Sequence, residues 1–478
     1  MTSFTVPAVI NGAYTVPDQT FDVVCPGTGE KVHQCALSDA ATAVRAVEAA
    51  AEAFPAWSRS PLGDRRRIFL EAARLMGEEK EKFFEAMSQE ISAPGPWAQF
   101  NVQTTVSIIE GVVGVLGCLA GEVTTLQDPG SSGMILYEPY GVALAIAPWN
   151  APAILGARSF LFPIAAGNTV VFKGSELSPR VHFLLVDIMH RAGLPRGVLN
   201  FVVTTPQHAP AVTEALIAHP ATRKVNFTGS TNVGRIISRL AGHHLKPVVM
   251  ELGGKASAVV CEDADLDLAA AQCALGAFLF SGQICMSTER VLVHASVGEA
   301  FEEKFVAAVR AQEEQMGVYP VVINDASLEK NTALLEDAVS KGAVLLNGSV
   351  DGKVQQAAGP RRMLRAIVKD VTPEMKLYKT ESFGPSVSLI RFSSEDEAIS
   401  IANNTEYGLS SAVFTRDLAT GLRLARSIEA GAVHINSMTV HDEPALPHGG
   451  FKASGWGRFN GVYGLREWVQ TKSVTWKV

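Results

Sequence analysis

The 478-residue chain lacks the features that would place it in several specialised classes of protein. Its six cysteines contain no CxxC pair, and a chain of this length does not need disulfide bonds to stabilise a small core, so we expect reduced thiols. Lys and Arg total 41 against 48 Asp and Glu, and the net charge of −7 provides no attraction for polyanions. We therefore expect no nucleic acid partner.

Long apolar segments are also missing from the sequence. The first twenty residues contain no basic segment followed by an apolar run, and no later stretch reaches about 18 uncharged apolar residues. Hydrophobic residues make up 47% and charged residues 19%, which is typical of a globular protein with a substantial core. These features predict a cytoplasmic protein without a membrane partner.

Two kinds of periodicity divide the chain. Residues 39–60 follow a capping Asp39 with apolar side chains at helical spacing, and a second helical pattern covers residues 65–90, so the N-terminal part is expected to be helix-rich. Residues 141–247 then alternate short apolar runs with polar loops and helical segments. This alternation predicts a parallel sheet wound with helices, with a ligand site at the carboxyl ends of its strands.

A second alternating set begins near residue 255 and predicts a second α/β domain. Residues 122–141 carry β-type runs around a DPGSSG turn, and the terminal KSVTWKV resembles a strand with no obvious local partner. We interpret both as arms that pair with another subunit. The predicted fold class is therefore α/β, with two wound parallel-sheet domains and a small β arm.

Three local patterns could carry chemistry, and each has an ordinary alternative. The dinucleotide fingerprint GxGxxG is absent, but GSTNVG at residues 229–234 could open a helix whose free amides hold a phosphate, or it could be a simple strand-to-helix turn. Cys285 follows a glycine-bearing polar stretch and is either a reactive thiol or an inert buried cysteine. Glu251 precedes two glycines that allow close backbone approach, although a solvated carboxylate is equally compatible.

These fragments occur together with others in a fixed order. The series resembles the motifs of the aldehyde dehydrogenase superfamily, and it comprises PWN (148–150), VVFKGSE (170–176), FTGSTNVG (227–234), ELGGK (251–255), GQIC (282–285), ESFGP (381–385) and GGFKASGWGR (449–458). The resemblance implies an NAD-binding domain at residues 1–118 and 140–250, a catalytic domain at 251–445 and a bridging arm at 119–139 and 459–478. It also implies a homodimer or tetramer.

The resemblance assigns roles to three residues. Cys285 matches the nucleophile that forms a tetrahedral adduct with an aldehyde and then a thioester. The Asn150 side-chain amide and the Cys285 backbone amide match the donors that stabilise the adduct's oxyanion. Glu251 matches the general base that activates water for hydrolysis of the thioester.

Further positions match the family's cofactor contacts, and no metal site is expected. Lys173 and Glu176 correspond to residues near the adenosine ribose, and a carboxylate there would repel a 2′-phosphate, so we expect NAD in preference to NADP. Before the motif context is considered, Lys173 alone resembles a solvated surface lysine. The remaining predicted cofactor contacts are Ala147, Pro148, Trp149, Ser175, Gly229, Ser230, Leu252, Glu381 and Phe383.

Several stretches, among them residues 97–102 and 278–291, resemble the aromatic branch of the family, which includes salicylaldehyde, vanillin and benzaldehyde dehydrogenases. An aromatic aldehyde is therefore expected, with Trp97 and Phe280 as flat apolar walls. Arg158 is either a donor to a ring hydroxyl or an ion-paired arginine. Met286 is also assigned to the substrate site, as is His448, which stands where many relatives carry an aromatic residue at the substrate mouth.

The sequence leaves three alternatives open. The chain could act on an aliphatic aldehyde or a semialdehyde, it could keep the fold as a non-catalytic structural or binding protein, or it could transfer the acyl group to coenzyme A. The presence of Cys285, Glu251 and Asn150 together argues against the second alternative. Glu251 argues against the third, because in the family this residue accompanies hydrolysis by water.

Overall fold

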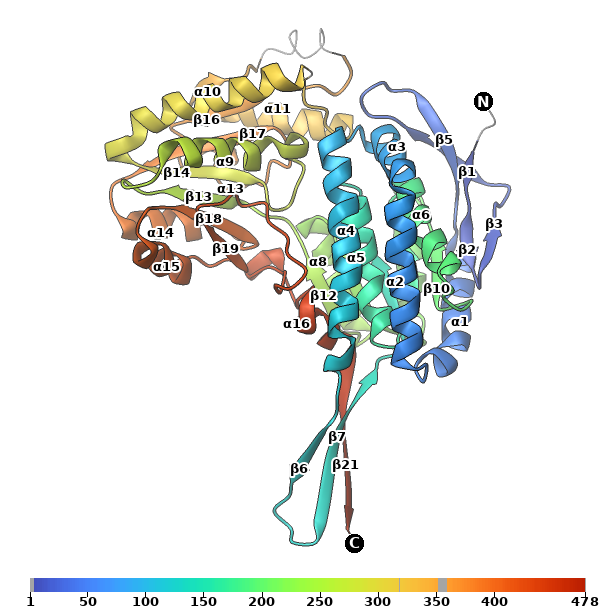
Figure 1. The fold of residues 1–478 in the computed structure, drawn as a ribbon. Coiled ribbons are helices and arrows are strands. Elements are labelled where there is room, and N and C mark those ends of the chain that lie inside the picture. The colour runs from blue at the N-terminus through green and yellow to red at the C-terminus, as the bar shows by residue number, and fades with distance from the viewer. Residues whose placement is uncertain (1–3, 318, 351–358, 478) are drawn as a thin grey trace.

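The computed structural model describes residues 4–317, 319–350 and 359–477. Figure 1 shows two bodies of helices and sheets beside each other and a narrow β arm that projects from one end of the molecule. Two large, mostly parallel sheets of eight and seven strands form the cores of these bodies, and the arm is a separate three-stranded sheet. The predicted α/β fold class is confirmed.

The first body contains the eight-stranded sheet, in the order β20-β12-β11-β8-β9-β10-β2-β3. The five central strands run parallel, and the edge strands β20, β2 and β3 are antiparallel to their neighbours. The four apolar runs predicted between residues 141 and 247 form β8, β9, β10 and β11. The strands are β2 (Ala8–Ile10), β3 (Ala13–Thr15), β8 (Val142–Ile146), β9 (Thr169–Lys173), β10 (Leu199–Val202), β11 (Thr222–Thr228), β12 (Val248–Glu251) and β20 (Gly455–Trp456).

Helices cover this sheet, and the first of them begins where the sequence predicts. Asp39 caps α1, because its Oδ1 accepts a hydrogen bond from the Thr42 N–H at 2.8 Å. The pattern at residues 65–90 belongs to two helices, since the backbone leaves the helical region at Glu79. The helices are α1 (Ala40–Trp57), α2 (Leu62–Glu78), α3 (Lys80–Ile91), α4 (Gly95–Val115), η1 (Leu116–Cys118), α5 (Pro152–Ala165), α6 (Pro179–Arg191), α7 (Ala209–Ala218), α8 (Thr231–His243) and α16 (Gly461–Arg466).

Residues 5–36 form strands, although the N-terminal part was expected to be helix-rich. Besides β2 and β3, they contribute a small sheet made of β1 (Thr5–Val6), β4 (Thr20–Val24) and β5 (Lys31–Ala36). β2 pairs with β10 and so extends the large sheet. The helical prediction holds from residue 40 onward.

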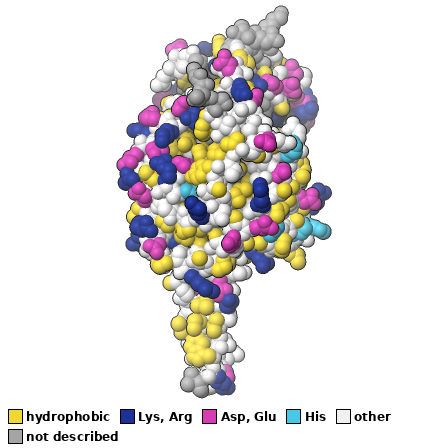
Figure 2. Space-filling model, turned by 90° about the vertical axis from the view of Figure 1, so that its right-hand side faces the viewer, with side chains coloured by type: hydrophobic (Ala, Val, Ile, Leu, Met, Phe, Trp, Pro, Cys, Tyr) yellow, Lys and Arg dark blue, Asp and Glu magenta, His cyan; other side chains and the backbone are white. Residues whose placement is uncertain are grey.

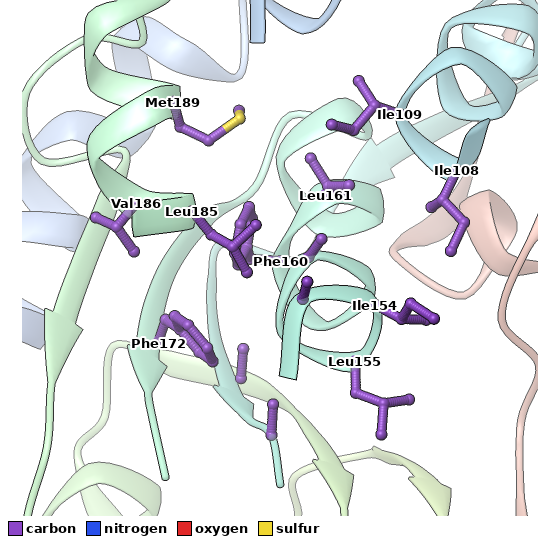
Figure 3. Close-up of a cluster of buried hydrophobic side chains, with 14 of the residues drawn as sticks. Ile108, Ile109, Ile154, Leu155, Phe160, Leu161, Phe172, Leu185, Val186 and Met189 are labelled. Carbon is purple, nitrogen blue, oxygen red and sulfur yellow. The ribbon is translucent and has the colours of Figure 1, made fainter. Parts of the chain in front are cut away.

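α4 is the one described helix that is long and apolar enough, by length and composition, to cross a membrane. In the structure it packs against α2, α3 and α5. Figure 3 shows Ile108 and Ile109 of α4 facing the apolar cluster that α5 builds with Phe172 of β9 and side chains of α6. This is the position of a core helix.

The second body contains the seven-stranded sheet, in the order β15-β16-β17-β14-β13-β18-β19, in which β15 alone is antiparallel to its neighbour. Its strands are β13 (Ala256–Val260), β14 (Thr288–His294), β15 (Val344–Asn347), β16 (Ala366–Lys369), β17 (Ser386–Phe392), β18 (Ser410–Phe414) and β19 (Ala432–Ile435). The helical segments are α9 (Leu266–Phe278), η2 (Leu279–Gly282), η3 (Ala295–Val297), α10 (Gly298–Met316), α11 (Asp325–Ser340), α13 (Lys376–Lys379), α14 (Glu395–Asn403), α15 (Leu418–Ser427) and η4 (Lys452–Ser454).

The arm consists of β6 (Glu122–Thr125), β7 (Ser131–Pro139) and β21 (Val469–Lys477). β21 pairs with β7 over its whole length, so the terminal strand has a partner that is distant in sequence but within its own chain. α16, which precedes β21, packs against α4 and α5 on the first body. Apolar side chains remain on the surface of the arm (Figure 2); Val123 is 85% exposed and Trp476 is 40% exposed.

The two large sheets meet at the carboxyl end of β12. Glu251 is the last residue of β12, and residues 252–255 lead directly into β13 of the other sheet. β8 and β11 are parallel to β12 and end at the same edge. Polar residues that follow these strands therefore converge where the second body begins, as expected for a ligand site in a wound sheet.

Candidate active site

Cys285 lies in the loop between η2 and β14, at the junction of the two bodies. Its Sγ–H donates a hydrogen bond to Glu251 Oε1 at 3.0 Å. Burial and the neighbouring carboxylate raise the pKa of the Cys285 thiol well above its usual value, so the resting group is a thiol. An acceptor for its proton is already in contact with it.

Two glycines bring this loop close to the strand end. A Cβ on Gly254 would lie 2.2 Å from the Cys285 carbonyl oxygen, and one on Gly253 would lie 2.7 Å from Glu381 Oε2. Any larger residue would have to displace the thiol loop or the carboxylate. The glycine pair of the ELGGK motif is thus explained by close approach.

Glu251 is 1% exposed and faces three polar partners. Besides Cys285, its carboxylate has His448 Nε2 at 3.3 Å from Oε1 and Arg158 Nη1 at 4.0 Å from Oε2. Burial alone raises the pKa of Glu251, but His448, Arg158 and the thiol hydrogen bond outweigh it and lower the pKa to about 2. Glu251 is therefore ionised and can accept a proton.

Asn150 follows β8 and is held in place on two sides. Its Nδ2 donates to the Gln283 carbonyl at 3.0 Å, and its own carbonyl accepts from Trp97 Nε1 at 3.0 Å. Within the described chain, neither the second N–H of the Asn150 amide nor the backbone N–H of Cys285 has an acceptor. Two donors thus remain available beside the thiol.

A cavity of about 240 Å³ gives access to these groups. It brings together most of the predicted nucleophile, base and cofactor residues, namely Pro148, Trp149, Asn150, Gly229, Ser230, Glu251, Leu252, Cys285, Glu381 and Phe383. Sequence reasoning missed Ile323, Asn324, Ser327 and Lys330, which also line it. Asn324 caps α11, because its Oδ1 accepts a hydrogen bond from the Ser327 N–H. An Asn in this capping position is the sequence feature that could have located the start of α11.

The remaining predicted cofactor residues follow β8 and β9 and lie outside this cavity. Glu176 lines a separate groove of about 770 Å³ along α7 and α8, and α8 also borders the cavity through Ser230 at its N-cap. Lys173 is 9% exposed; burial lowers its pKa and the Glu176 charge opposes that shift. Ala147 and Ser175 are buried near the strand ends and line neither space.

Glu381 follows α13 and lines the cavity beside the residues that follow β12. Its Oε1 accepts a hydrogen bond from the Gly254 N–H at 2.8 Å. Burial and the charge of Glu289 raise the pKa of Glu381 to about 7. Glu289 itself pairs with Lys255 at 2.5 Å and accepts hydrogen bonds from the Ser382 and Phe383 N–H groups, so it fixes the loop that carries Glu381.

The predicted substrate residues lie behind the cavity lining. Trp97 stacks on Phe280, with ring centroids 5.5 Å apart and an angle of 13° between the planes. Trp149, which does line the cavity, meets the edge of Phe280 at 6.2 Å. Met286 is 8% exposed and packs in the core. The aromatic pair thus supports the cavity wall from behind.

Arg158 and His448 have positions that differ from those expected at a substrate mouth. Arg158 is 2% exposed and forms a buried ion pair with Asp442, which matches the ion-paired interpretation, and it does not line the cavity. His448 is 8% exposed and contacts Glu251. Both side chains surround the carboxylate of Glu251. The sequence could not predict the contact between His448 and Glu251, because the two residues are 197 positions apart.

The described residues contain no group of three or more His, Cys, Asp or Glu side chains arranged to hold a metal ion. All six cysteines are free, and among the described residues Cys285 is the cysteine that lines this cavity.

Comparison with known proteins places these groups in a family context. The family model described as aldehyde dehydrogenase family matches residues 14–474. A vanillin dehydrogenase of Pseudomonas sp. strain HR199 is 42% identical over 99% of this chain and 98% of its own. A salicylaldehyde dehydrogenase of Pseudomonas sp. strain C18 is 39% identical over 98% of this chain and 97% of its own.

The solved structures give the same result. The structure of a salicylaldehyde dehydrogenase from Pseudomonas putida G7 in complex with salicylaldehyde has a TM-score of 0.94 and 37% identity, and the match covers 99% of this chain and 98% of that one. The fold is also similar to that of an NAD-dependent aldehyde dehydrogenase from Sinorhizobium meliloti, with a TM-score of 0.94 and 32% identity over 99% of this chain and 95% of that one. An NADP-dependent enzyme from E. coli has a TM-score of 0.93 and 30% identity over 99% of this chain and 98% of that one.

Proposed function

The chain belongs to the aldehyde dehydrogenase family, and from that premise we propose that it oxidises an aromatic aldehyde to the carboxylic acid with NAD as the preferred cofactor. The observation that carries the mechanistic part is the 3.0 Å contact between Cys285 Sγ and Glu251 Oε1, beside the free amide donors of Asn150 and Cys285. A thiol with a base in contact and donors for an oxyanion is the arrangement that thioester chemistry requires.

The first step uses the ionised Glu251. The carboxylate accepts the Cys285 proton, the thiolate forms a bond to the aldehyde carbon, and the carbonyl π electrons become an oxyanion. The second N–H of Asn150 and the backbone N–H of Cys285 then stabilise that oxyanion. Loss of one such donor typically costs about 3 kcal/mol of transition-state stabilisation.

The second step forms the thioester. NAD, when bound, supplies the acceptor for the hydride that leaves the former aldehyde carbon. As the carbonyl re-forms, the carbon stays bonded to Cys285 Sγ. Glu251 first releases the Cys285 proton to solvent and is again a carboxylate. It then takes a proton from a water molecule that attacks the thioester, the C–S bond breaks to release the carboxylic acid, and Glu251 returns that proton to the Cys285 thiolate.

The residues on the carboxyl edge of the first sheet fit NAD. Ser230 opens α8, whose N-terminus favours a pyrophosphate. Within the described residues, the side chains of Lys173 and Glu176 form no hydrogen bond with protein groups, so both can bind a ribose diol. The apolar side chains of Val233 and Ile236, 44% and 55% exposed, line the groove beside Glu176 and suit a flat base. The Glu176 carboxylate disfavours a 2′-phosphate.

An aromatic substrate is supported by the relatives that act on vanillin and salicylaldehyde and by the aromatic layer behind the cavity. Trp149 lines the cavity and is held by the edges of Phe280 and Phe383. A rigid apolar wall of this kind favours a flat ring over a flexible chain. Arg158 is not included in this proposal, because its guanidinium is paired with Asp442.

We also propose that the protein is a homodimer or a tetramer. The arm leaves apolar side chains in solvent, with Val123 85% exposed, and its sheet has an open edge at β6. Exposed edge strands with apolar side chains usually pair with a second chain. Sedimentation or light scattering on the full chain measures this, and a monomeric mass would contradict it.

A panel of aldehydes assayed separately with NAD and NADP tests the proposed function. We expect higher kcat/KM for salicylaldehyde and benzaldehyde than for hexanal, and higher kcat/KM with NAD than with NADP. Cys285→Ala should abolish turnover while NAD binding persists. A clear preference for hexanal would end the aromatic assignment, and an unchanged rate in the Cys285 variant would end the mechanism.

A further inference from the structure

The buried cluster around Glu251 contains more negative than positive charge unless His448 carries a proton. Glu251 and Asp442 are carboxylates, and Arg158 supplies one positive charge, which its contact with Asp442 already uses. Arg158 is 4.0 Å from Glu251, at the limit of an ion pair. Since a buried carboxylate without a balancing cation is strongly unfavourable, a second cation is needed.

His448 occupies the position for that second cation. Its Nε2 lies 3.3 Å from Glu251 Oε1, the same oxygen that accepts the Cys285 hydrogen bond, although the contact is not aligned as a hydrogen bond. Its backbone is fixed by two hydrogen bonds with Phe459, at 2.9 Å and 2.7 Å. The imidazole is thus held against the carboxylate by the fold.

The other charged groups near Glu251 do not replace His448. Cys285 faces it from the η2–β14 loop and is a neutral thiol at rest, and Glu381, which also lines the cavity, is a further acid. Asp442 is held by Arg158 and by Asn460 Nδ2 at 2.9 Å. His434 of β19 is adjacent to His441 and interacts with His448 at longer range, and burial lowers the pKa of His434 to about 4, so it is neutral.

We propose that His448 is a positioning residue that balances the charge of Glu251, holds its carboxylate against Cys285, and thereby sets the acid limit of turnover. The inference rests on the proposed function, because it requires Glu251 to act as the base. His448 touches Glu251 and not the cavity, so its effect is indirect. Without it, burial would favour the protonated form of Glu251, which cannot accept a proton.

The test compares kcat against pH, from about pH 5 to about pH 9, for the wild type, His448→Gln and His448→Phe. In the wild type the pKa of Glu251 is about 2, so protonation of this base should not lower kcat within the range. In both variants the charge that opposes the effect of burial is missing, so kcat should fall to half of its alkaline value at a pH inside the range. At the alkaline end kcat should recover in His448→Gln, and KM for the aldehyde should stay within about twofold, because the substrate contacts are untouched.

His441→Gln is the matched control, since His441 lies on the same connecting segment but is exposed and does not contact Glu251. Its profile should equal that of the wild type. The inference is overturned if both His448 variants keep the wild-type acid limit, or if they lose the same fraction of kcat at every pH, which would mean a merely structural role. If the wild type reduces no NAD with any aldehyde, the proposed function fails instead.

Discussion

Two glutamates that line one cavity differ in their charge. Glu251 and Glu381 both line the cavity beside Cys285, and burial raises the pKa of each. Beside Glu251, His448 and Arg158 reverse that effect and lower the pKa of Glu251 to about 2. Beside Glu381, Glu289 adds to it and the pKa of Glu381 reaches about 7.

The difference shows that neighbouring charge, and not depth of burial, decides which carboxylate can serve as a base at neutral pH. A cation beside Glu251 keeps it ionised across the working range. A carboxylate beside Glu381 leaves it close to half protonated near pH 7, where it can act as a hydrogen-bond partner for a hydroxyl. Each variant below changes one charged side chain.

Among the charged side chains, the largest effect is expected for Glu251→Gln. Loss of a positioned base should lower kcat by about 10²-fold to 10⁴-fold, because neither the thiol nor the attacking water then has a proton acceptor. Steady-state kinetics with salicylaldehyde and NAD measure it. Glu262→Gln is the control, since Glu262 is exposed on the second body and should keep the wild-type rate. A variant at position 251 with near-normal kcat would contradict the role of Glu251.

A loss of stability is expected for Arg158→Met. Removing this buried cation leaves Glu251 and Asp442 without their shared partner, and breaking such a cluster costs about 3–5 kcal/mol of unfolding free energy. Denaturant unfolding measures the change. Arg74→Met, which removes the exposed ion pairs with Glu71 and Glu78 on α2, should have a much smaller effect on unfolding. Equal effects in the two variants would show that the cluster is not coupled to folding.

A smaller effect on unfolding free energy, and one that depends on pH, is expected at Glu381. Its pKa in the folded protein is raised to about 7, so between its usual value and pH 7 the folded chain holds a proton that the unfolded chain has lost. Stability from this group therefore falls as pH rises through that window, by about 2 kcal/mol. Glu381→Gln should remove the decline, as measured by unfolding near pH 5 and pH 7. If the fall in stability between pH 5 and pH 7 were unchanged in this variant, another group would have to cause it.

The smallest effect is expected at a third carboxylate, Glu176, which lies in the groove outside the cavity. Glu176→Ser removes the charge that would repel a 2′-phosphate, so kcat/KM with NADP should rise relative to NAD by about tenfold, equivalent to about 1.4 kcal/mol. Separate assays with each cofactor give the ratio. An unchanged ratio would show that Glu176 does not select the cofactor.

The sequence predicted the parts of this site that depend on local pattern. Short apolar runs followed by polar loops located β8, β9 and β11, and parallel strands bring their carboxyl ends to one edge. Asp39 identified the start of α1 through its capping side chain. The family motifs then added Cys285, Glu251 and Asn150, which the fold brings together.

What the sequence could not predict depends on distant contacts. Arg158, Asp442 and His448 come from α5 and from a long loop of the second body, and no local periodicity links them to Glu251. Ile323 and Asn324 belong to none of the family motifs in the sequence, yet they lie in the cavity wall. The end of α2 at Glu79 was missed because the apolar spacing continues into α3.

The covalent intermediate on Cys285 is the central claim, and mass spectrometry of Glu251→Gln tests it most directly. Without Glu251 the Cys285 proton must pass to solvent, so the thioester should form slowly. It should hydrolyse more slowly still, because no positioned base remains to activate the attacking water. Mixing this variant with salicylaldehyde and NAD should therefore leave the protein heavier by one acyl group, located on the peptide that contains Cys285. An unmodified Cys285, or an acyl group on another residue, would contradict the account.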